Sequence, residues 1–322
     1  MKKDLLEILV CPSCRTGLEY LVHIEENGEI KEGELKCNRG HIFLIKNFLP
    51  YFSKKLDYVD IFDFIQTSIP FGDFENKRVY DNKCAYEITE KEFIAQTKLD
   101  PKSFNGKLVL DVGCGGGRFV YYLNQFGARI VGIDLRYEGL ARSVKNFKQN
   151  DRIHFAQADL FNLPFKEKCF DFIYSFGVLH HTPDPKKAFV GLTRFLKPGA
   201  DIAVWVYPKS EKTYISDKLR FITRHMPKSL LYILGLFITS IYAPFLKIPK
   251  FNNRLKDILY RIRLPWYDHW NWRIHSFMDW YGPMYQSKHT YEELKSWFEE
   301  SGLGDILLCP YPVSVRGTLK NE

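Results

Sequence analysis

Short apolar runs alternate with amphipathic segments through the middle of this 322-residue chain. The runs have the length of buried strands, and they lie at 107–112, 129–134, 153–160, 170–175 and 201–207. Helical segments such as Arg118–Phe126 separate them, and a further helix is predicted at 291–300 before strands at 304–308 and 312–316. Alternating strands and helices predict an α/β fold, namely a doubly wound, mostly parallel, Rossmann-like sheet.

The first 55 residues have the pattern of a small β module instead. Leu18–Ile24 and Glu34–Cys37 predict strands, and Asn27-Gly28 between them predicts a tight hairpin turn. A unit of this size buries too little apolar surface to be stable alone, so we expect it to depend on a bound metal.

Two close pairs of metal ligands fit that expectation. CxxC followed by CxxxH places four soft or borderline ligands at Cys11, Cys14, Cys37 and His41. Four protein ligands leave no coordination position for water around tetrahedral Zn(II), so the zinc site is predicted to be structural. We expect loss of the metal to unfold this module alone. The alternative is a pair of exposed thiols near a chance Cys/His pair.

Acidic residues end three of the predicted strands. Asp111 precedes the glycine-rich loop 113–117, Asp134 follows 23 residues later, and Asp159 ends the third strand. Glycines permit positive φ and close approach of a ligand to the backbone, and ligands of parallel sheets bind at the carboxyl ends of the strands. The dinucleotide pattern G-x-G-x-x-G fails, because Arg118 occupies its third glycine position. The alternative is that these acids only terminate strands or cap helices.

Several stretches resemble class I S-adenosylmethionine (SAM)-dependent methyltransferases, especially the branch containing the ubiquinone and menaquinone methyltransferases. They are LDVGCGGGRF, GIDL, ADLFNLPF, FDFIYSFGVLHHTPDP and LKPGADIAVWVY, and they cover about residues 106–207. Residues 5–52 resemble the zinc-ribbon domain of methyltransferase-activator proteins, and also the zinc module of certain bacterial rRNA guanine methyltransferases.

The first resemblance implies SAM as cofactor, with the glycine loop at its methionyl end. It implies that Asp134 accepts the ribose hydroxyls, that Asp159 and Leu160 meet the adenine, and that 175–177 borders the methyl-transfer pocket. The cofactor-binding residues predicted in this way are Asp111, Gly113, Cys114, Gly115, Asp134, Leu135, Asp159, Leu160 and Ser175.

A general base is needed only if the methyl acceptor must lose a proton. His180 and His181 follow the fourth strand within plausible reach and are the candidate catalytic residues. The alternative is a pair that shapes the start of the next helix. Rival bases are His275, His289, Tyr281 and Tyr285.

The segment 209–289 predicts a helical insertion that covers the substrate. It holds 14 Lys plus Arg against five Asp plus Glu, so it carries the excess behind the net charge of +8 and would favour an anionic partner. Four of the six tryptophans lie in it, namely Trp266, Trp270, Trp272 and Trp280. Within it, 229–246 is uncharged, and three roles stay open: a helix buried in the core or an oligomer interface, an interfacial membrane or lipid-substrate helix, and a membrane span.

The chain thus divides into a zinc-binding module (1–55), a linker or helical lid (56–105), a SAM-binding core (106–208), the insertion (209–289), and a terminal helix with strands that complete the core (290–322). Within the lid, Tyr80, Tyr86 and Glu87 are candidate cofactor contacts, and plain packing is the alternative for each.

Together these patterns predict a methyltransferase acting on a small or lipid-linked metabolite, such as a glycan, a quinone-like ring or a prenyl-linked acceptor. The alternatives are an rRNA or tRNA methyltransferase and a non-catalytic SAM-binding partner of another protein. The fourth strand ends in Tyr174-Ser175-Phe176-Gly177, which lacks the Asn/Asp-Pro-Pro-Tyr/Phe pattern used on exocyclic base amines. Seven cysteines, four of them scattered singly, favour a reducing, cytoplasmic location, with membrane association through 229–246 and homodimerisation as open alternatives.

Overall fold

A computed structural model describes residues 1–53, 56–69, 83–148, 150–210, 214–248, 255–256, 258–265 and 270–321. The chain forms two compact units. The first contains Met1–Lys55, Glu75–Pro208 and Ser287–Glu322, and the second contains Leu56–Phe74 and Lys209–Gln286.

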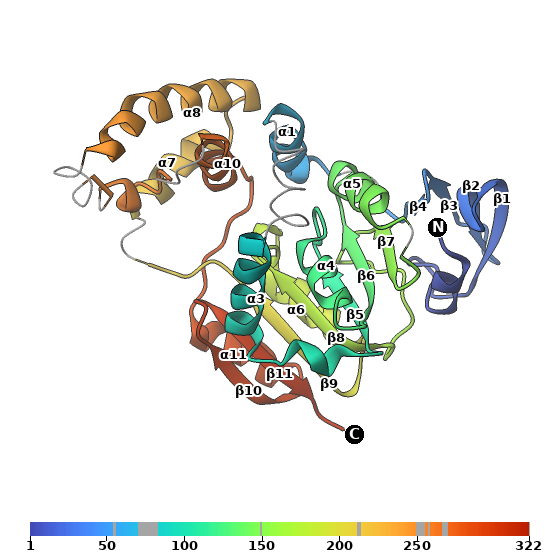
Figure 1. The fold of residues 1–322 in the computed structure, drawn as a ribbon. Helices are drawn as coiled ribbons and strands as arrows, with labels where there is room; N and C mark the ends of the chain where they lie inside the picture. The colour runs from blue at the N-terminus through green and yellow to red at the C-terminus, as the bar shows by residue number, and fades with distance from the viewer. Residues whose placement is uncertain are drawn as a thin grey trace. The chain divides into compact units, whose positions relative to one another are not determined.

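The first unit is built on a seven-stranded sheet, which confirms the predicted fold class (Figure 1). Its strand order is β10-β11-β9-β8-β5-β6-β7, and all neighbours are parallel except those of β11, which is antiparallel to β9 and to β10. The bounds are β5 Leu108–Val112, β6 Arg129–Asp134, β7 Ile153–Gln157, β8 Phe170–Phe176, β9 Leu196–Trp205, β10 Leu303–Cys309 and β11 Ser314–Leu319. From β5 the chain adds β6 and β7 on one side and then β8 and β9 on the other side. Ligands of such sheets bind at the carboxyl ends of the two strands where the order switches, which are β5 and β8 here.

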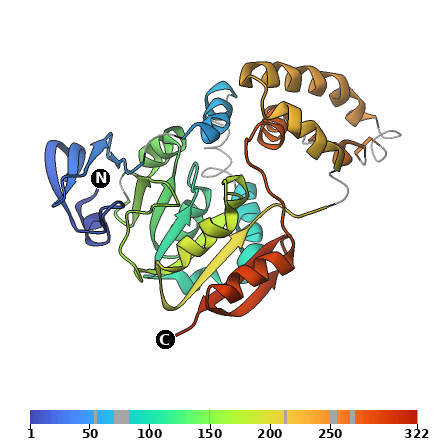
Figure 2. The ribbon, with the colours of Figure 1, turned by 180° about the vertical axis from the view of Figure 1, so that it is seen from behind.

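Helices cover both faces of this sheet because alternate strand residues point to opposite sides. Val109 and Phe172 pack into one apolar cluster with α3 (Lys83–Thr97), α4 (Arg118–Asn124) and α5 (Tyr137–Phe147). Leu110 and Ile173 pack into the other with α6 (Pro185–Thr193) and α11 (Tyr291–Glu300), which lie in front of the sheet in Figure 2.

The zinc module is a four-stranded antiparallel sheet in the order β1-β2-β3-β4. Its strands are β1 Leu18–Glu26, β2 Glu29–Cys37, β3 Ile42–Lys46 and β4 Leu49–Pro50, and a short 3-10 helix, η1 Lys3–Glu7, precedes them. The predicted hairpin turn is present, since Asn27 and Gly28 both have positive φ (54° and 79°). β3 and β4 were not predicted as strands, because pairing defines them rather than their own pattern: β3 pairs with β2, and β4 pairs with β3.

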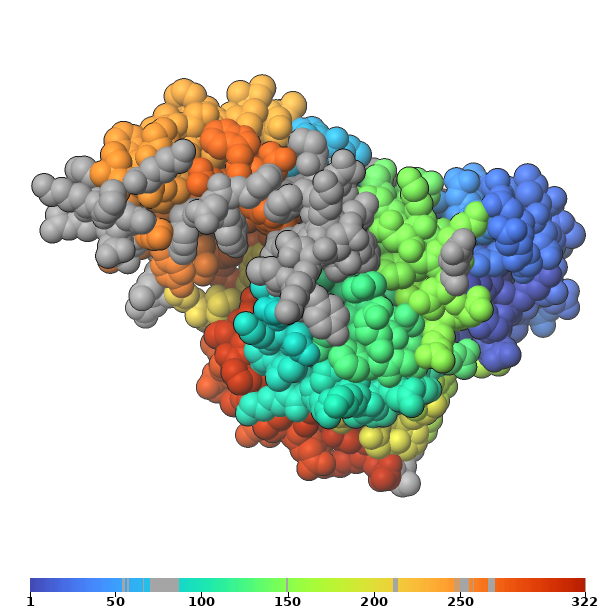
Figure 3. Space-filling view, in the orientation of Figure 1, coloured from blue at the N-terminus to red at the C-terminus, as the bar shows by residue number. Residues whose placement is uncertain are grey.

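The zinc module shares its core with the methyltransferase-like sheet. Leu9, Leu35 and Phe52 are buried in the same apolar cluster as Phe165 and Leu163. Backbone bonds join the two parts as well: Val10 N donates to Pro164 O and Lys166 N donates to Ile8 O, both at 2.8 Å. In the space-filling view the blue module lies directly against the green residues of the core (Figure 3). The expectation that metal loss unfolds the module alone is therefore revised, because its unfolding would expose core residues such as Phe165.

The second unit is helical, as predicted for the insertion. It contains η2 Asp57–Val59, α1 Asp60–Ser68, α7 Tyr214–Thr223, α8 Lys228–Tyr242, η6 Ala243–Lys247 and α10 Trp270–Tyr281. α8 packs closely on α10 at Gly235, where an added Cβ would lie 2.6 Å from the Phe277 ring. One continuous helical segment, Lys228–Leu246, is long and apolar enough to cross a membrane.

Two boundaries differ from those expected. Residues 56–105 do not form one lid, because α1 packs on α10 in the second unit, whereas α3 packs on α4 and β11 in the first. The insertion also ends earlier, since Ser287 N donates to His180 O and His289 N donates to Tyr207 O, both at 2.9 Å. Tyr80 and Trp266 lie outside the described residues, as does the side chain of Tyr86; Glu87 is exposed on α3.

Candidate functional site

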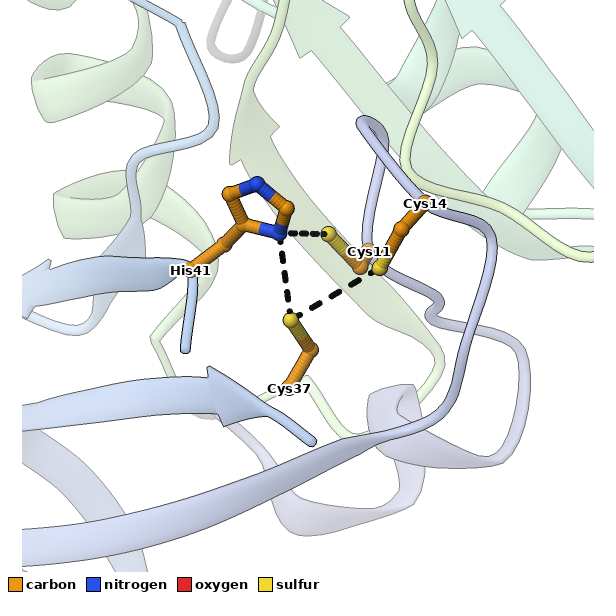
Figure 4. A group of neighbouring side chains, drawn as sticks. All are labelled: Cys11, Cys14, Cys37 and His41. Carbon is orange, nitrogen blue, oxygen red and sulfur yellow. Dashed lines mark hydrogen bonds between the residues drawn. The ribbon is translucent and has the colours of Figure 1, made fainter. Parts of the chain in front are cut away.

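The four predicted zinc ligands come together at one end of the N-terminal module (Figure 4). Their ligand atoms all lie within 4.8 Å of one another, with Cys14 Sγ 3.7 Å from Cys37 Sγ. His41 Nδ1 lies 3.5 Å from Cys11 Sγ and 3.3 Å from Cys37 Sγ. Zn–S bonds of about 2.3 Å and Zn–N bonds of about 2.0 Å at tetrahedral angles require separations of about 3.5–3.8 Å. The side chains are therefore set for one tetrahedral zinc ion.

Two backbone turns present these ligands. Cys11 N donates to Thr16 O, Arg15 N donates to Cys11 O, and Arg15 has a positive φ of 63°. The second turn closes with Gly40 at φ 85°. The Thr16 hydroxyl, 3.1 Å from Cys14 Sγ, lowers the pKa of that thiol to about 6, which favours the thiolate that zinc binds.

The first turn also anchors the module to the core. The Arg15 guanidinium donates to Leu163 O at 2.7 Å and to Phe165 O. Because Arg15 directly follows Cys14, metal binding holds this side chain where it reaches the loop after β7. The zinc site thus fixes a contact of the core as well as the fold of the module.

The glycine loop after β5 is shaped by contacts that exclude side chains. Gly113 has φ +81°, and an added Cβ would lie 2.3 Å from Val178 Cγ2, in the loop that follows β8. Gly115 has φ +51°, and an added Cβ there would meet only the Arg136 guanidinium, at 3.6 Å. The space beside the Gly115 Cα is therefore open to a close ligand, with the Gly115 N–H and carbonyl bonded to Asp134 and Ser143, whereas Gly113 ties the β5 loop to the β8 loop.

Asp134 connects the end of β6 to the glycine loop. Its Oδ2 accepts from Gly115 N at 3.0 Å and its Oδ1 accepts from Arg136 N at 3.0 Å. The Arg136 guanidinium lies 3.3 Å from the same carboxylate. The carboxylate is thus held rigidly beside the loop, as a ligand for a ribose diol must be.

Asp111 is buried at the end of β5, where burial raises the pKa of its carboxyl to about 7. The neighbouring Tyr174 hydroxyl, on β8, acts in the opposite direction. A buried acid beside a ligand loop is a group that a bound cation would ionise, because an opposite charge favours the charged form.

The other predicted cofactor residues differ in burial and in their hydrogen bonds. Asp159 lies just beyond β7, which ends at Gln157, and its Oδ1 accepts from Phe161 N at 3.0 Å. Leu160 is partly buried against the core. Ser175 is fully buried and donates to Val112 O at 3.2 Å, so its side chain faces the sheet interior.

The Cys114 side chain also points inward, with Sγ packed toward Gly132, and burial raises its pKa well above the ordinary value. Only backbone atoms of Cys114 are left to face a cofactor. Leu135 contributes through its carbonyl, which accepts from Gln157 Nε2 at 2.9 Å. The role of each as a cofactor contact stays a prediction.

The two candidate catalytic histidines are buried in an aromatic cluster. The His180 ring stacks on Tyr207 with 3.9 Å between centroids, and the His181 ring lies 4.2 Å from that of His180. His181 N donates to Val178 O within η4 (Leu179–His181). This setting suits packing at the start of α6, and a catalytic role of either ring stays a prediction.

Among the rival bases, His289 is held by two side chains. It shares a hydrogen bond of 2.8 Å with Ser287 Oγ and one of 3.1 Å with Glu293, and burial lowers the pKa of its ring while Glu293 acts in the opposite direction. Tyr281 donates to the Ile262 carbonyl, and burial raises its pKa. His275 packs against Trp272 and Tyr285 against Tyr58, all in the helical unit.

Two functional contacts escaped the sequence reasoning. Arg136 pairs with Asp134, and Gln157 links Leu135 O to the segment after β4, where its Oε1 accepts from Ser53 N at 3.2 Å and its carbonyl accepts from Phe52 N at 2.8 Å. Arg136 stands two residues after a strand-end acid, a signal that could have been used. No sequence signal pointed to Gln157, because its partners Ser53 and Leu135 are remote in sequence.

Comparison with known proteins identifies two parts of the chain. Residues 110–204 match the family described as "Methyltransferase domain", and residues 2–47 match "Trm112p-like protein". Phosphoethanolamine N-methyltransferase 2 of Caenorhabditis elegans is 29% identical over 177 residues, which are 48% of this chain and 40% of that protein. Ubiquinone biosynthesis O-methyltransferase of Hahella chejuensis is 31% identical over 119 residues, which are 34% of this chain and 47% of that protein.

Among solved structures, Haemonchus contortus phosphoethanolamine N-methyltransferase 2, in complex with phosphomonomethylethanolamine and S-adenosylhomocysteine, is 17% identical. The match has a TM-score of 0.47 and covers 82% of this chain and 48% of that one. The chain spans less than half the length of each of these relatives.

SAM is the cofactor that fits the described site. Its methionyl, ribose and adenine parts need an open backbone loop and separate polar contacts, and these are offered along one edge by the Gly115 loop, Asp134 and Asp159. The sulfonium and ammonium charges of SAM suit an edge lined by three carboxyl groups. When bound, SAM supplies an activated methyl group, and the protein supplies position and exclusion of water.

Replacing a zinc ligand should release the metal and weaken the whole first unit. We expect Cys14→Ser to lose its zinc and to lower the melting temperature of the protein, since the module shares its core with Phe165. Zinc content and thermal unfolding measure both effects. The matched control is Cys169→Ser, a cysteine outside the cluster, which should keep one zinc per chain. Full zinc content in Cys14→Ser would contradict the assignment.

Asp134→Ala should abolish SAM binding, with an affinity loss of at least about a hundredfold, because charge-assisted hydrogen bonds are worth about 1.5–3 kcal/mol each. Calorimetric titration with SAM measures it. Asp151→Ala, an exposed acid of the same unit, should bind normally, and His181→Ala should bind SAM but turn over more slowly. Retained affinity in a folded Asp134→Ala protein would refute the role of this carboxylate.

Asp111→Asn should change how stability depends on pH. The ordinary pKa of this group is 3.8 and the folded value is about 7, so between these values the unfolded chain releases a proton that the folded chain keeps. Wild-type stability therefore falls as pH rises through this window, by up to roughly 4 kcal/mol. The variant lacks this loss, so its stability relative to wild type should increase from about pH 4 to about pH 7 in urea unfolding of the SAM-free protein. A constant difference would contradict the buried, protonated carboxyl.

Proposed function

Because residues 110–204 are a methyltransferase domain and residues 2–47 a Trm112p-like zinc-ribbon domain, we propose that this chain is a SAM-dependent methyltransferase acting on a small or lipid-linked metabolite. The zinc-ribbon domain has a structural role in this proposal, and it acts through its packing on the core. The cellular location that fits free cysteines is the cytoplasm, and the six cysteines whose side chains are described are all free.

The observation that carries the proposed acceptor class is an aromatic wall at the carboxyl ends of β8 and β9. Phe176, Trp205 and Tyr207 are half-buried there. Phe176 meets Phe119 of α4 edge-on at 5.3 Å, and Trp205 lies 5.7 Å from Tyr207 and 5.3 Å from Tyr311. Flat apolar surfaces of this kind bind rings and hydrocarbon chains well, whereas a phosphate backbone needs cations.

The named relatives support the same class. The domain matches enzymes named for phosphoethanolamine and for ubiquinone biosynthesis, which are a small polar molecule and a prenylated ring. Tyr174 and Ser175 are buried in the sheet, so these two side chains are not available to hydrogen-bond the polar edge of an extruded base. RNA methylation and a non-catalytic role are the alternatives.

In the proposed mechanism the protein aligns the acceptor with the methyl group and excludes water. Asp134 and the Gly115 loop hold the donor, and the aromatic wall orients the acceptor. If the acceptor must lose a proton, His289 is a candidate base in the first unit, because Ser287 and Glu293 hold its ring at 2.8 Å and 3.1 Å.

The test is to incubate the protein with methyl-labelled SAM and an extract of the cells that encode it, and to separate RNA, protein, lipid and small-molecule fractions. We expect label in the lipid or small-molecule fraction, and none with Asp134→Ala. Label in RNA would overturn the acceptor class. SAM binding by titration without label in any fraction would favour the non-catalytic alternative.

A further inference from the structure

Helix α8 is apolar on two opposite faces, and only one of them is packed. Leu231, Gly235, Thr239 and Tyr242 are buried on the inner side, where Gly235 meets Phe277 of α10. The outer side carries an exposed stripe at helical spacing, with Ile233 60% and Phe237 62% exposed. The members of this stripe are Leu230, Ile233, Phe237 and Ile241.

Other exposed apolar side chains of the second unit lie outside this helix. Phe245 in η6 and Ile248 after it are exposed, and so are Ile215, Leu219 and Ile222 at helical spacing on α7. More than half of the exposed large hydrophobic side chains of the described residues belong to the second unit, which holds less than a third of the chain. A stripe of exposed apolar side chains such as the one on α8 marks a binding surface rather than the ordinary scatter of apolar residues.

The charge of the segment that contains α8 indicates which kind of partner covers the exposed stripe. From residue 218 to residue 256 the sequence contains eight basic residues and no Asp or Glu. They are Lys218, Arg224, Lys228, Lys247, Lys250, Arg254 and Lys256, together with Arg220, which is buried and donates to the Trp280 and Pro283 carbonyls and so is not one of the surface cations. Apolar side chains bordered by cations match the surface of an anionic bilayer, where the chains enter the acyl boundary and the cations meet lipid phosphates. Two copies of this segment would bring like charges together, which disfavours self-association through it.

We propose that the outer face of α8 and η6 docks on an anionic membrane, with the helix lying in the plane of the interface. Lying flat keeps the inner face on α10, whereas a membrane span would pull Gly235 and Tyr242 away from their partners. Lys228, at the start of α8, pairs with Asp60 of α1 at 3.1 Å, so this end of the helix is also held in the unit. Docking requires neither SAM nor methyl transfer, so it stands independently of the proposed function.

The experiment is co-sedimentation of the full chain, without SAM, with vesicles of phosphatidylcholine alone or mixed with phosphatidylglycerol. We expect binding to the mixed vesicles that weakens with added salt. The double variant Ile233→Ser/Phe237→Ser should bind at least about tenfold more weakly, because it loses two apolar side chains from the interface. Arg224→Glu should weaken binding to the anionic vesicles by about fivefold or more.

The matched control is Val190→Ser, an exposed apolar residue of α6 in the first unit, which should bind like wild type. Thermal unfolding of the double variant should match wild type, because both side chains are exposed. The proposal is overturned if wild type does not bind the anionic vesicles, or if the folded double variant binds equally well. A concentration-dependent dimer that the double variant abolishes, without vesicle binding, would assign the surface to a second copy instead.

Discussion

The cofactor edge depends on one crowded turn, the first residues after β5. Gly113 leaves no room for a side chain because Val178, from the loop after β8, occupies that space. Two residues on, Gly115 N is bound to the carboxylate at the end of β6. Three strand ends are thus fixed to each other within a few residues, and the buried carboxyl of Asp111 lies directly beneath them. Gly113 and Gly115 both have positive φ, which glycine adopts without strain. Gly113 is also required because any side chain there would collide with Val178.

Much of this arrangement follows from the sequence, because buried parallel strands are continuous apolar runs and zinc ligands have fixed spacing. Each strand of the sheet was predicted, with errors at the ends. The third strand stops at Gln157 rather than at 160, since Asp159 turns the chain, and β9 begins at Leu196 because it pairs with β8 across a register shift. The end of a strand is thus set by its neighbouring strand or by a turn, and not by the local apolar pattern.

What the sequence did not reveal rests on contacts between remote segments. Leu9 shares a core with Phe165, Gln157 accepts hydrogen bonds from the segment after β4, and α1 packs on α10. No local period in the sequence relates the residues of these contacts. The helical unit is a similar case. Its apolar run was evident, but only the structure separates the face that packs on α10 from the face that stays exposed.

The covalent link between the zinc module and the core has a consequence for how the protein works in dilute solution. The module docks through Leu9, Phe52 and Arg15 onto the loop after β7, a surface that two separate chains would have to find by collision. Within one chain that encounter is intramolecular, so its effective concentration is set by the connecting chain and not by the amount of protein in solution. The assembled state therefore does not depend on the abundance of a second protein, and the two parts are always made in equal number.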